Sequence, residues 1–335
     1  KIRRSSILHE LMKAPKYSVV IPVYNRPDEL DELLSSLVQQ TFSDFEVIVV
    51  EDGSSIKSQS VVEKYRTKLT IDYILKTNTG PGPSRNAGFQ KARGDYFVVF
   101  DSDCILPTTY FEAVEGFIRS TNVDAWGGPD RGHENFTFLQ RAMAHTMSSF
   151  FTTGGIRGGA KMVGNYQPRS FNMVISRSAF QLTGGFKFDR FAEDIELSIR
   201  MRQLGLSIVF IPDAYVFHKR RATLIQFYQQ VFNFGKGRAR IGALHAGEVK
   251  WVHWFPTFFL LGLFSLGLLF LFNSPAALVV GVGYLAYVCL VMLDGLKRTK
   301  STKVTLLSVP ALFVQLTGYG IGFFAEKLKL LRSKR

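Results

Sequence analysis

The stretch NTGPGPSRNAGFQKARGDYFVVFDSDC, residues 78–104, joins a glycine-rich loop, a helical pattern and an apolar strand that stops at two aspartates. The helical pattern covers residues 84–93, and the strand covers residues 96–100. Three further apolar runs precede it at 17–22, 45–50 and 71–75, with helical patterns between them. This βαβαβαβ order predicts an α/β fold with a doubly wound, mainly parallel sheet.

Polar side chains follow the predicted strands where each one ends, namely Asn25, Asp52, Asp101 and Asp103. Ligands of doubly wound sheets bind beyond the carboxyl ends of the strands, so we expect these side chains to converge. Asp101 and Asp103 could face one hard cation, Mg²⁺ or Mn²⁺, that also takes phosphate oxygens. Taken alone, the Asp-Ser-Asp triplet also fits a solvated turn.

Two loops carry features that suit a nucleotide. Asp52 is followed by Gly53 and Ser54, which commonly form a turn, but its carboxylate could also accept a hydrogen bond from a nucleobase N–H. The loop from Gly80 to Gly88 opens a helix with Arg85 in its first turn. Helix N-termini and arginine both favour phosphate, although an ordinary capped loop fits the same residues.

Two later motifs add acidic and basic groups. Glu193 and Asp194 precede a helical pattern at 195–204, where Asp194 is either a helix cap or a carboxylate that takes a proton from an attacking hydroxyl. His218 ends a predicted strand at 207–217 and is followed by three cations, Lys219, Arg220 and Arg221. A lone histidine is more often structural, but beside two carboxylates it could complete a metal site, and the cations could neutralise a diphosphate.

The charge distribution separates two kinds of partner. The formal net charge is +14, yet residues 17–218 carry 20 basic and 23 acidic groups, a net of −3. The basic excess lies beside apolar segments, which favours an anionic membrane surface and argues against a nucleic-acid groove. The two cysteines, Cys104 and Cys289, form neither a disulfide framework nor a metal-finger spacing, so we expect a reducing compartment.

Long uncharged runs predict a membrane region at 255–325. The runs 255–272 and 276–293 are each long enough, at roughly 27 Å as helices, to span a bilayer. The run 304–325 is either a third span or a re-entrant segment broken at Pro310. Residues 222–254 read as amphipathic interfacial helices, and residues 1–16 and 326–335 as a basic N-terminal segment and a basic tail.

The flanking sequence also predicts an orientation. Nothing near residue 1 resembles a signal peptide, and the basic stretch at 297–303 favours the cytoplasmic side. We therefore expect a multi-pass protein of the cytoplasmic (inner) membrane, with its catalytic domain facing the cytoplasm.

Six segments together resemble the family 2 glycosyltransferases of the GT-A fold. They are SVVIPVYNRPDEL (18–30), FEVIVVEDGSS (45–55), the segment 78–104 quoted above, FNMVISRSAFQLTGGF (171–186), AEDIELSIRMRQLG (192–205) and IPDAYVFHKRR (211–221). Their order is far more specific than any one of them, and it implies a GT-A catalytic domain over 17–221. Glu51 departs from the pattern, since Asn or Asp is commoner at its position.

The resemblance implies roles for the donor-side residues. Asp52 would contact the nucleotide base, while Pro22 and Tyr24 would shape its pocket. Arg85 matches a loop on the nucleotide side.

The resemblance also implies a metal site and a base. Asp101 and Asp103 would form the D-x-D pair, with Asp103 the direct ligand of Mg²⁺ or Mn²⁺ and His218 an additional ligand. Asp194 would be the catalytic base, with Glu193 beside it.

The implied reaction is inverting transfer of one sugar from a nucleotide-diphosphate sugar, with a UDP-sugar favoured. The acceptor would be a lipid-linked polyprenyl-diphosphate saccharide in surface polysaccharide or glycan assembly. Processive synthases carry Q-x-x-R-W before their membrane segments, whereas this chain has Gln-Val-Phe-Asn-Phe at 230–234, which favours single transfer. The alternatives are transfer directly onto polyprenyl phosphate and a non-catalytic, membrane-anchored nucleotide-sugar-binding relative.

Overall fold

The structure, a computed structural model, describes residues 14–119, 123–131, 136–155, 166–219 and 221–332. By their internal contacts these residues form two units. The first takes its described residues from 14–131 and 166–218, and the second from 136–155 and 219–332. Residues 136–155, which lie within the catalytic domain expected at 17–221, therefore group with the second unit.

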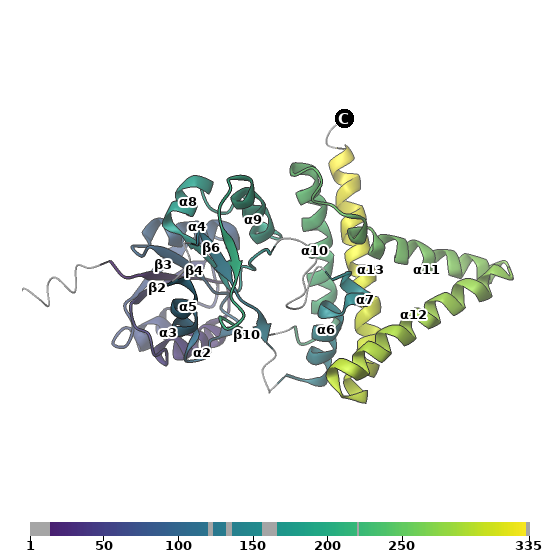
Figure 1. Cartoon of the computed structure of the whole chain (residues 1–335), viewed down its shortest axis with the longest axis horizontal. Coiled ribbons are helices and arrows are strands. Elements are labelled where there is room, and N and C mark those ends of the chain that lie inside the picture. Colours follow the sequence, from purple (N-terminus) through teal and green to yellow (C-terminus); the bar gives the residue numbers. More distant parts are fainter. Residues whose placement is uncertain (1–13, 120–122, 132–135, 156–165, 220, 333–335) are drawn as a thin grey trace, which may run out of the picture. The chain divides into compact units, whose positions relative to one another are not determined.

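The strands predicted at 17–22, 45–50, 71–75 and 96–100 lie in the central sheet of the first unit, together with strands that the sequence did not predict (Figure 1). The sheet contains β1 (Tyr17–Val23), β2 (Phe45–Asp52), β3 (Ile71–Lys76), β4 (Tyr96–Val99), β6 (Ala125–Gly127), β8 (Met173–Ser176) and β9 (Ile208–Phe210), in the spatial order β3-β2-β1-β4-β8-β6-β9. Strand β8 is antiparallel to both of its neighbours, and the other neighbouring pairs are parallel. The predicted α/β fold with a mainly parallel sheet is confirmed.

Helices cover both faces of this sheet (Figure 1). One face carries α2 (Pro27–Val38), α3 (Gln59–Tyr65) and α5 (Tyr110–Ile118), and the other carries α4 (Pro81–Lys91), α8 (Arg177–Thr183) and α9 (Glu193–Gln203). Helix α2 shows how the sequence sets this arrangement: Pro27 starts it, acidic residues occupy its first turn, and its leucines face the core. Successive residues of β1 belong alternately to the two cores, since Val19 and Ile21 pack on one face and Val20 on the other.

A small second sheet lies beside the end of β4. It contains β5 (Cys104–Ile105), β10 (Val216–His218) and β7 (Asp130–Arg131), with His218 directly opposite Cys104 in the antiparallel β5–β10 pair. The single strand predicted at 207–217 is wrong, because β9 and β10 lie in different sheets. Pro212 lies between them, and proline cannot donate a ladder hydrogen bond.

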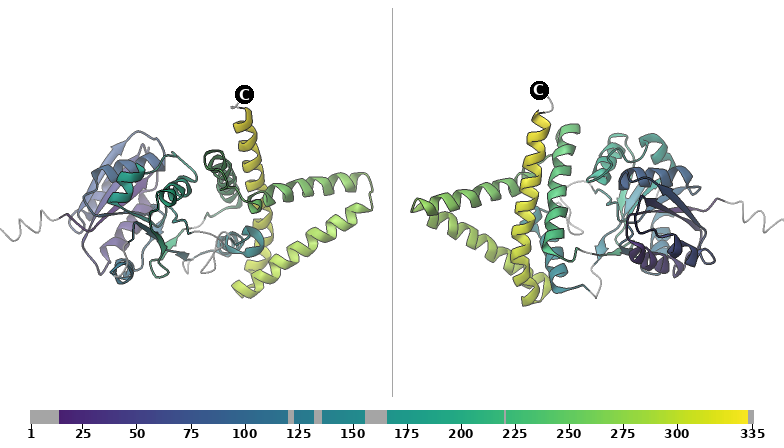
Figure 2. Two further views of the ribbon diagram at one scale, coloured as in Figure 1. Left: turned by 45° about the horizontal axis from the view of Figure 1, so that its top comes forward. Right: turned by 180° about the vertical axis from the view of Figure 1, so that it is seen from behind.

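The second unit is helical. It contains α6 (Phe138–Ser148), α7 (Phe150–Thr153), α10 (Leu224–Leu244), the 3₁₀ turn η1 (Trp251–His253), α11 (Phe255–Leu271), α12 (Ala276–Thr299) and α13 (Thr302–Arg332). Both views of Figure 2 show α10 lying along α13, and α11 and α12 running out from α13 to meet at their connection. Helix α13 continues through Pro310 and to Arg332, so neither a break at Pro310 nor a separate tail from 326 is present in that stretch.

Glycines let α10 and α13 pack closely. A Cβ at Gly322 would lie 2.0 Å from the Phe232 carbonyl oxygen, and one at Gly235 would lie 2.2 Å from that of Tyr319. Small residues at such a crossing allow two backbones to approach. The sequence predicted amphipathic interfacial helices over 222–254. The structure has one long helix there, α10, whose buried face contacts α13.

Two helices among the described residues, α12 and α13, are long and apolar enough to cross a membrane, and α11 is a shorter apolar helix of 17 residues. Large apolar side chains such as Phe264, Leu278 and Leu285 are exposed on α11 and α12. Asp294 of α12 is paired despite this setting: it accepts hydrogen bonds from Ser149 and Arg298 and lies 3.1 Å from His145 Nε2. The chain therefore has the features of a membrane-associated protein.

Candidate active site

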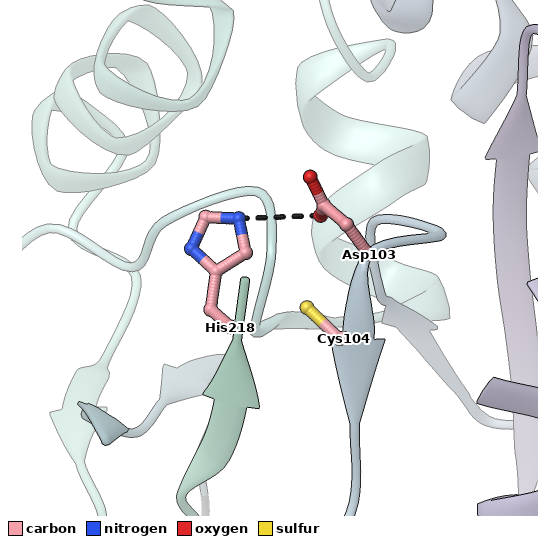
Figure 3. A group of neighbouring side chains, drawn as sticks. All are labelled: Asp103, Cys104 and His218. Carbon is pink, nitrogen blue, oxygen red and sulfur yellow. Dashed lines mark ion pairs between the residues drawn. The ribbon is translucent and has the colours of Figure 1, made fainter. Parts of the chain in front are cut away.

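The turn between β4 and β5 places Asp103 beside the end of β10. The Asp103 carboxylate is nearly buried, and its Oδ1 lies 3.2 Å from His218 Nε2. Its Oδ2 accepts a 2.9 Å hydrogen bond from Arg26 Nη1. Figure 3 shows Asp103, Cys104 and His218 side by side, and their ligand atoms all lie within 4.8 Å of one another. The sequence predicted two of these three residues as metal ligands.

These residues fit a divalent cation. A carboxylate oxygen and an imidazole nitrogen are both ligands that Mn²⁺ and related metals accept. Because the two atoms already lie close together and are nearly buried, little rearrangement would be needed for both to contact one ion. Asp101, the other half of the predicted D-x-D pair, is directed elsewhere, since its Oδ1 accepts a 2.7 Å bond from Arg85.

Arg85 connects the D-x-D turn to the start of α9. Its guanidinium is 2% exposed and donates to Asp101 Oδ1 and to Glu193 Oε1, each at 2.7 Å. Gly80, with φ of 100°, begins α4 in a conformation that favours glycine and so directs the helix carrying Arg85. The structure thus places Arg85 on two protein carboxylates.

The start of α9 is held in an uncommon backbone conformation. Phe191 and Ala192 have φ values of 60° and 65°, and strain of this kind gathers at functional sites. Burial raises the pKa of the Glu193 carboxyl, Arg85 opposes that rise, and Asp194 adds to it. Asp194 follows Glu193, and its Oδ2 accepts a 3.2 Å bond from the Ser170 backbone N–H. The predicted base is therefore adjacent in the chain to a residue bonded to Arg85.

Asp52 ends β2 in a pocket of donors. Its Oδ1 accepts from Lys76 Nζ and from the Thr79 N–H, and its Oδ2 accepts from the Gly80 N–H. Burial alone would raise the pKa of Asp52, but these bonds outweigh it and hold the pKa below its usual value. A hydrogen bond from the Ser84 side chain acts in the same direction and also lowers the pKa of Asp52.

The remaining predicted residues lie at the end of β1 or outside the first unit. Pro22 is half-buried in β1, and Tyr24, just after it, is 50% exposed. Asn25 links the loops that follow β1 and β2, because its Oδ1 accepts hydrogen bonds from the Ser55 and Ile56 N–H groups. Arg221 belongs to the second unit, and Arg220 lies outside the described residues.

Sequence reasoning missed three residues that contact the predicted ones. Arg26 bonds Asp103, Lys76 bonds Asp52, and Cys104 lies with Asp103 and His218. Two of them offered a signal: Arg26 follows Asn25 at a predicted strand end, and Cys104 directly follows the D-x-D pair. The only sequence signal at Lys76 was its position directly after the strand predicted at 71–75.

Comparison with known sequences finds a matching family model and two relatives that are both glycosyltransferases. Residues 18–181 match the family model described as Glycosyl transferase family 2. The chain is 38% identical over 113 residues to the poly(ribitol-phosphate) beta-N-acetylglucosaminyltransferase TarS of Staphylococcus aureus, covering 32% of this chain and 20% of TarS. It is 30% identical over 118 residues to the cholesterol galactosyltransferase of Borreliella burgdorferi, covering 35% of this chain and 33% of that protein. The matches thus span a fifth to a third of these relatives.

A solved structure shares the fold over most of the chain. The mannosyltransferase PcManGT from Pyrobaculum calidifontis, determined in complex with GDP-Man and Mn²⁺, superposes with a TM-score of 0.62 at 18% identity. The superposition covers 91% of this chain and 88% of that one. At this identity the likeness concerns the fold alone.

Proposed function

Because residues 18–181 match the Glycosyl transferase family 2 model, we propose that the chain moves one sugar, with inversion, from a nucleotide-diphosphate sugar to a lipid-linked saccharide. The proposed acceptor is a polyprenyl-diphosphate saccharide, and the proposed setting is surface polysaccharide or glycan assembly. A UDP-sugar is the favoured donor.

One observation supports the proposed chemistry above the others. Arg85 bridges Asp101 and Glu193 at 2.7 Å to each, although the two carboxylates come from segments far apart in the chain. The bridge brings the D-x-D turn and the start of α9 to the same edge of the sheet. A metal ligand and a base must both lie near one donor for an inverting transfer, so the proximity of these two segments supports assigning those roles to Asp103 and Asp194.

In the proposed mechanism Asp194 is the base. The acceptor hydroxyl attacks the anomeric carbon from the face opposite the diphosphate, and Asp194 takes the hydroxyl proton as the new C–O bond forms. The bond from the anomeric carbon to the diphosphate breaks, and its electron pair leaves with the diphosphate. A divalent metal held by Asp103 and His218 would supply positive charge for the leaving diphosphate.

Other residues would prepare this step. Asp52 would contact the nucleotide base, and Pro22 and Tyr24 would border the base. Arg85 would fix the two carboxylates without contacting the donor. Arg220 and Arg221 are proposed to meet the diphosphate, in keeping with their charge.

The membrane features support a lipid-linked acceptor. Helices α12 and α13 are apolar enough to cross a bilayer, and the basic groups at 297–303 lie where α12 ends and α13 begins. Such groups favour the cytoplasmic side and attract anionic lipid. We therefore propose a multi-pass protein of the inner membrane with its catalytic domain in the cytoplasm.

The test uses the full chain in nanodiscs with Mn²⁺, each of UDP-GlcNAc, UDP-glucose and GDP-mannose, and two acceptors. We expect transfer to a polyprenyl-diphosphate-linked sugar, with an anomeric configuration opposite to that of the donor by proton NMR. Transfer to polyprenyl phosphate alone would replace the proposed acceptor by its runner-up. Retention of configuration would contradict the inverting mechanism, and donor binding without transfer to either acceptor would favour a non-catalytic relative.

A further inference from the structure

We propose that Cys104 is a third ligand of the metal site, so that Asp103, Cys104 and His218 bind soft divalent ions such as Zn²⁺ and Cd²⁺. This inference deepens the proposed function at its metal site. It rests on the proposed function only for the assignment of Asp103 and His218 as metal ligands. The family resemblance pointed to oxygen and nitrogen ligands. A thiol in the same cluster changes which ions the site prefers.

The strand register directs the cysteine toward the histidine. Cys104 and His218 are partners in the antiparallel β5–β10 pair, and partners in such a pair extend their side chains to the same side of the sheet. Asp103 precedes Cys104 in the same turn. Figure 3 shows the sulfur, the imidazole and the carboxylate gathered on one side, with their ligand atoms within 4.8 Å of one another.

The spacing of the ligand atoms suits a small tetrahedral ion. Two ligands each about 2.0 Å from tetrahedral Zn²⁺ lie roughly 3.3 Å apart. Asp103 Oδ1 and His218 Nε2 are separated by 3.2 Å. The sulfur, which lies within 4.8 Å of both atoms, would move toward them to occupy a third corner, since a thiolate binds Zn²⁺ at about 2.3 Å. The fourth corner stays open for a donor oxygen or water.

Contacts around the cluster hold the ligands in place. The Phe171 ring stacks on the His218 ring, with centroids 4.6 Å apart, and the Phe171 carbonyl accepts the Cys104 thiol at 3.5 Å. Arg26 bonds the second oxygen of Asp103. Outer contacts of this kind fix the orientation of metal ligands and are costly to remove.

Binding through Cys104 has a defined chemical balance. The S–H bond breaks as the sulfur–metal bond forms, the proton passes to the buffer, and no electrons are transferred. Thiolate is a soft ligand, so it favours Zn²⁺ and Cd²⁺ over Mg²⁺. Because the same Asp103 and His218 atoms serve both kinds of ion, Zn²⁺ would compete with Mn²⁺ or Mg²⁺ at this site.

The test uses Co²⁺ as a spectroscopic substitute for Zn²⁺ and the full chain in detergent. The variant Cys289→Ser leaves Cys104 as the sole thiol, without changing the cluster. We expect Co²⁺ to produce a thiolate-to-metal charge-transfer band in this variant, and one equivalent of Zn²⁺ to abolish it. Absence of the band would overturn the proposal.

A second measurement compares the two cysteines. We expect Cys104→Ser to lower the Zn²⁺ affinity at least about 10-fold, the lower end of what outer contacts alone cost, whereas Cys289→Ser leaves it unchanged. Equal affinities in the two variants would contradict the proposal. If Cys104→Ser fails to fold, the Co²⁺ spectrum of Cys289→Ser still decides. Sugar transfer with Mn²⁺ is measured in parallel, so a missing sulfur ligand and a missing transferase activity are distinguished.

Discussion

The bridge formed by Arg85 makes a strong prediction about stability. In Arg85→Met, Asp101 and Glu193 each lose a 2.7 Å ion pair, and Glu193 is left nearly buried with no countercharge from Arg85. Removing one partner of a buried ion pair costs about 3–5 kcal/mol. At about 2–4 °C per kcal/mol for a domain of this size, the Tm should fall by roughly 6–20 °C.

Arg66→Met is the matched control, since it removes an arginine from an exposed pair. Arg66 Nε lies 2.8 Å from Glu63, and both side chains are more than 40% exposed. Exposed pairs contribute up to about 1 kcal/mol. Thermal unfolding of both variants by circular dichroism checks the prediction, and a Tm for Arg85→Met within 3 °C of that of Arg66→Met would refute the reasoning.

The same bridge predicts a kinetic signature. Arg85→Lys keeps the charge, but one ammonium cannot reproduce the two-armed guanidinium contact. Because Arg85 is buried on protein carboxylates, we expect kcat to fall at least about 10-fold, or about 1.4 kcal/mol in the barrier, while donor Kd changes less than about 3-fold. Loss of donor affinity with unchanged kcat would instead support a direct contact between Arg85 and the donor phosphate.

Two further changes test other parts of the structure. Gly322→Ala would place a methyl group 2.0 Å from the Phe232 carbonyl oxygen and should lower the Tm, with an overpacking cost of about 1–3 kcal/mol. Gly267→Ala is the control and should not lower the Tm, because a Cβ at Gly267 meets nothing within 4 Å. Equal Tm values for the two variants would contradict the close α10–α13 contact. Asp52 has a lowered pKa, so its contribution to stability is present above its unfolded pKa of about 3.9 and is lost as the pH falls through its folded value. Wild-type Tm should therefore fall more steeply below pH 4 than that of Asp52→Asn, and parallel curves would show that the Asp52 bonds are not stabilising.

Much of the first unit could be predicted from local patterns. The runs at 17–22 and 45–50 are apolar and β-branched, and they became β1 and β2 because a parallel sheet buries both faces of its strands. The polar residues at their ends then had to lie at one edge. Asn25 and Asp52 follow this rule, and their positions needed no knowledge of side-chain contacts.

Contacts between distant segments could not be predicted in the same way. Arg85 lies in α4, in a glycine-rich stretch that suggests phosphate, and its contact with Glu193 depends on a helix that begins 108 residues later. The pairing of Cys104 with His218 depends on the register of two very short strands, which no periodicity marks. Helices α6 and α7 carry no sequence signal that assigns them to the second unit, because packing against α13 and α12 decides it.

Asp194 is the residue on which the account depends, and a comparison of turnover with donor affinity in Asp194→Asn tests it most directly. Asp213→Asn, at an exposed carboxylate between β9 and β10, is the matched control. The account predicts that Asp194→Asn loses at least about 100-fold in kcat, the lower range for removal of a base, while its donor Kd stays within about 3-fold of wild type. Turnover in Asp194→Asn equal to that of Asp213→Asn would contradict the proposed role of Asp194.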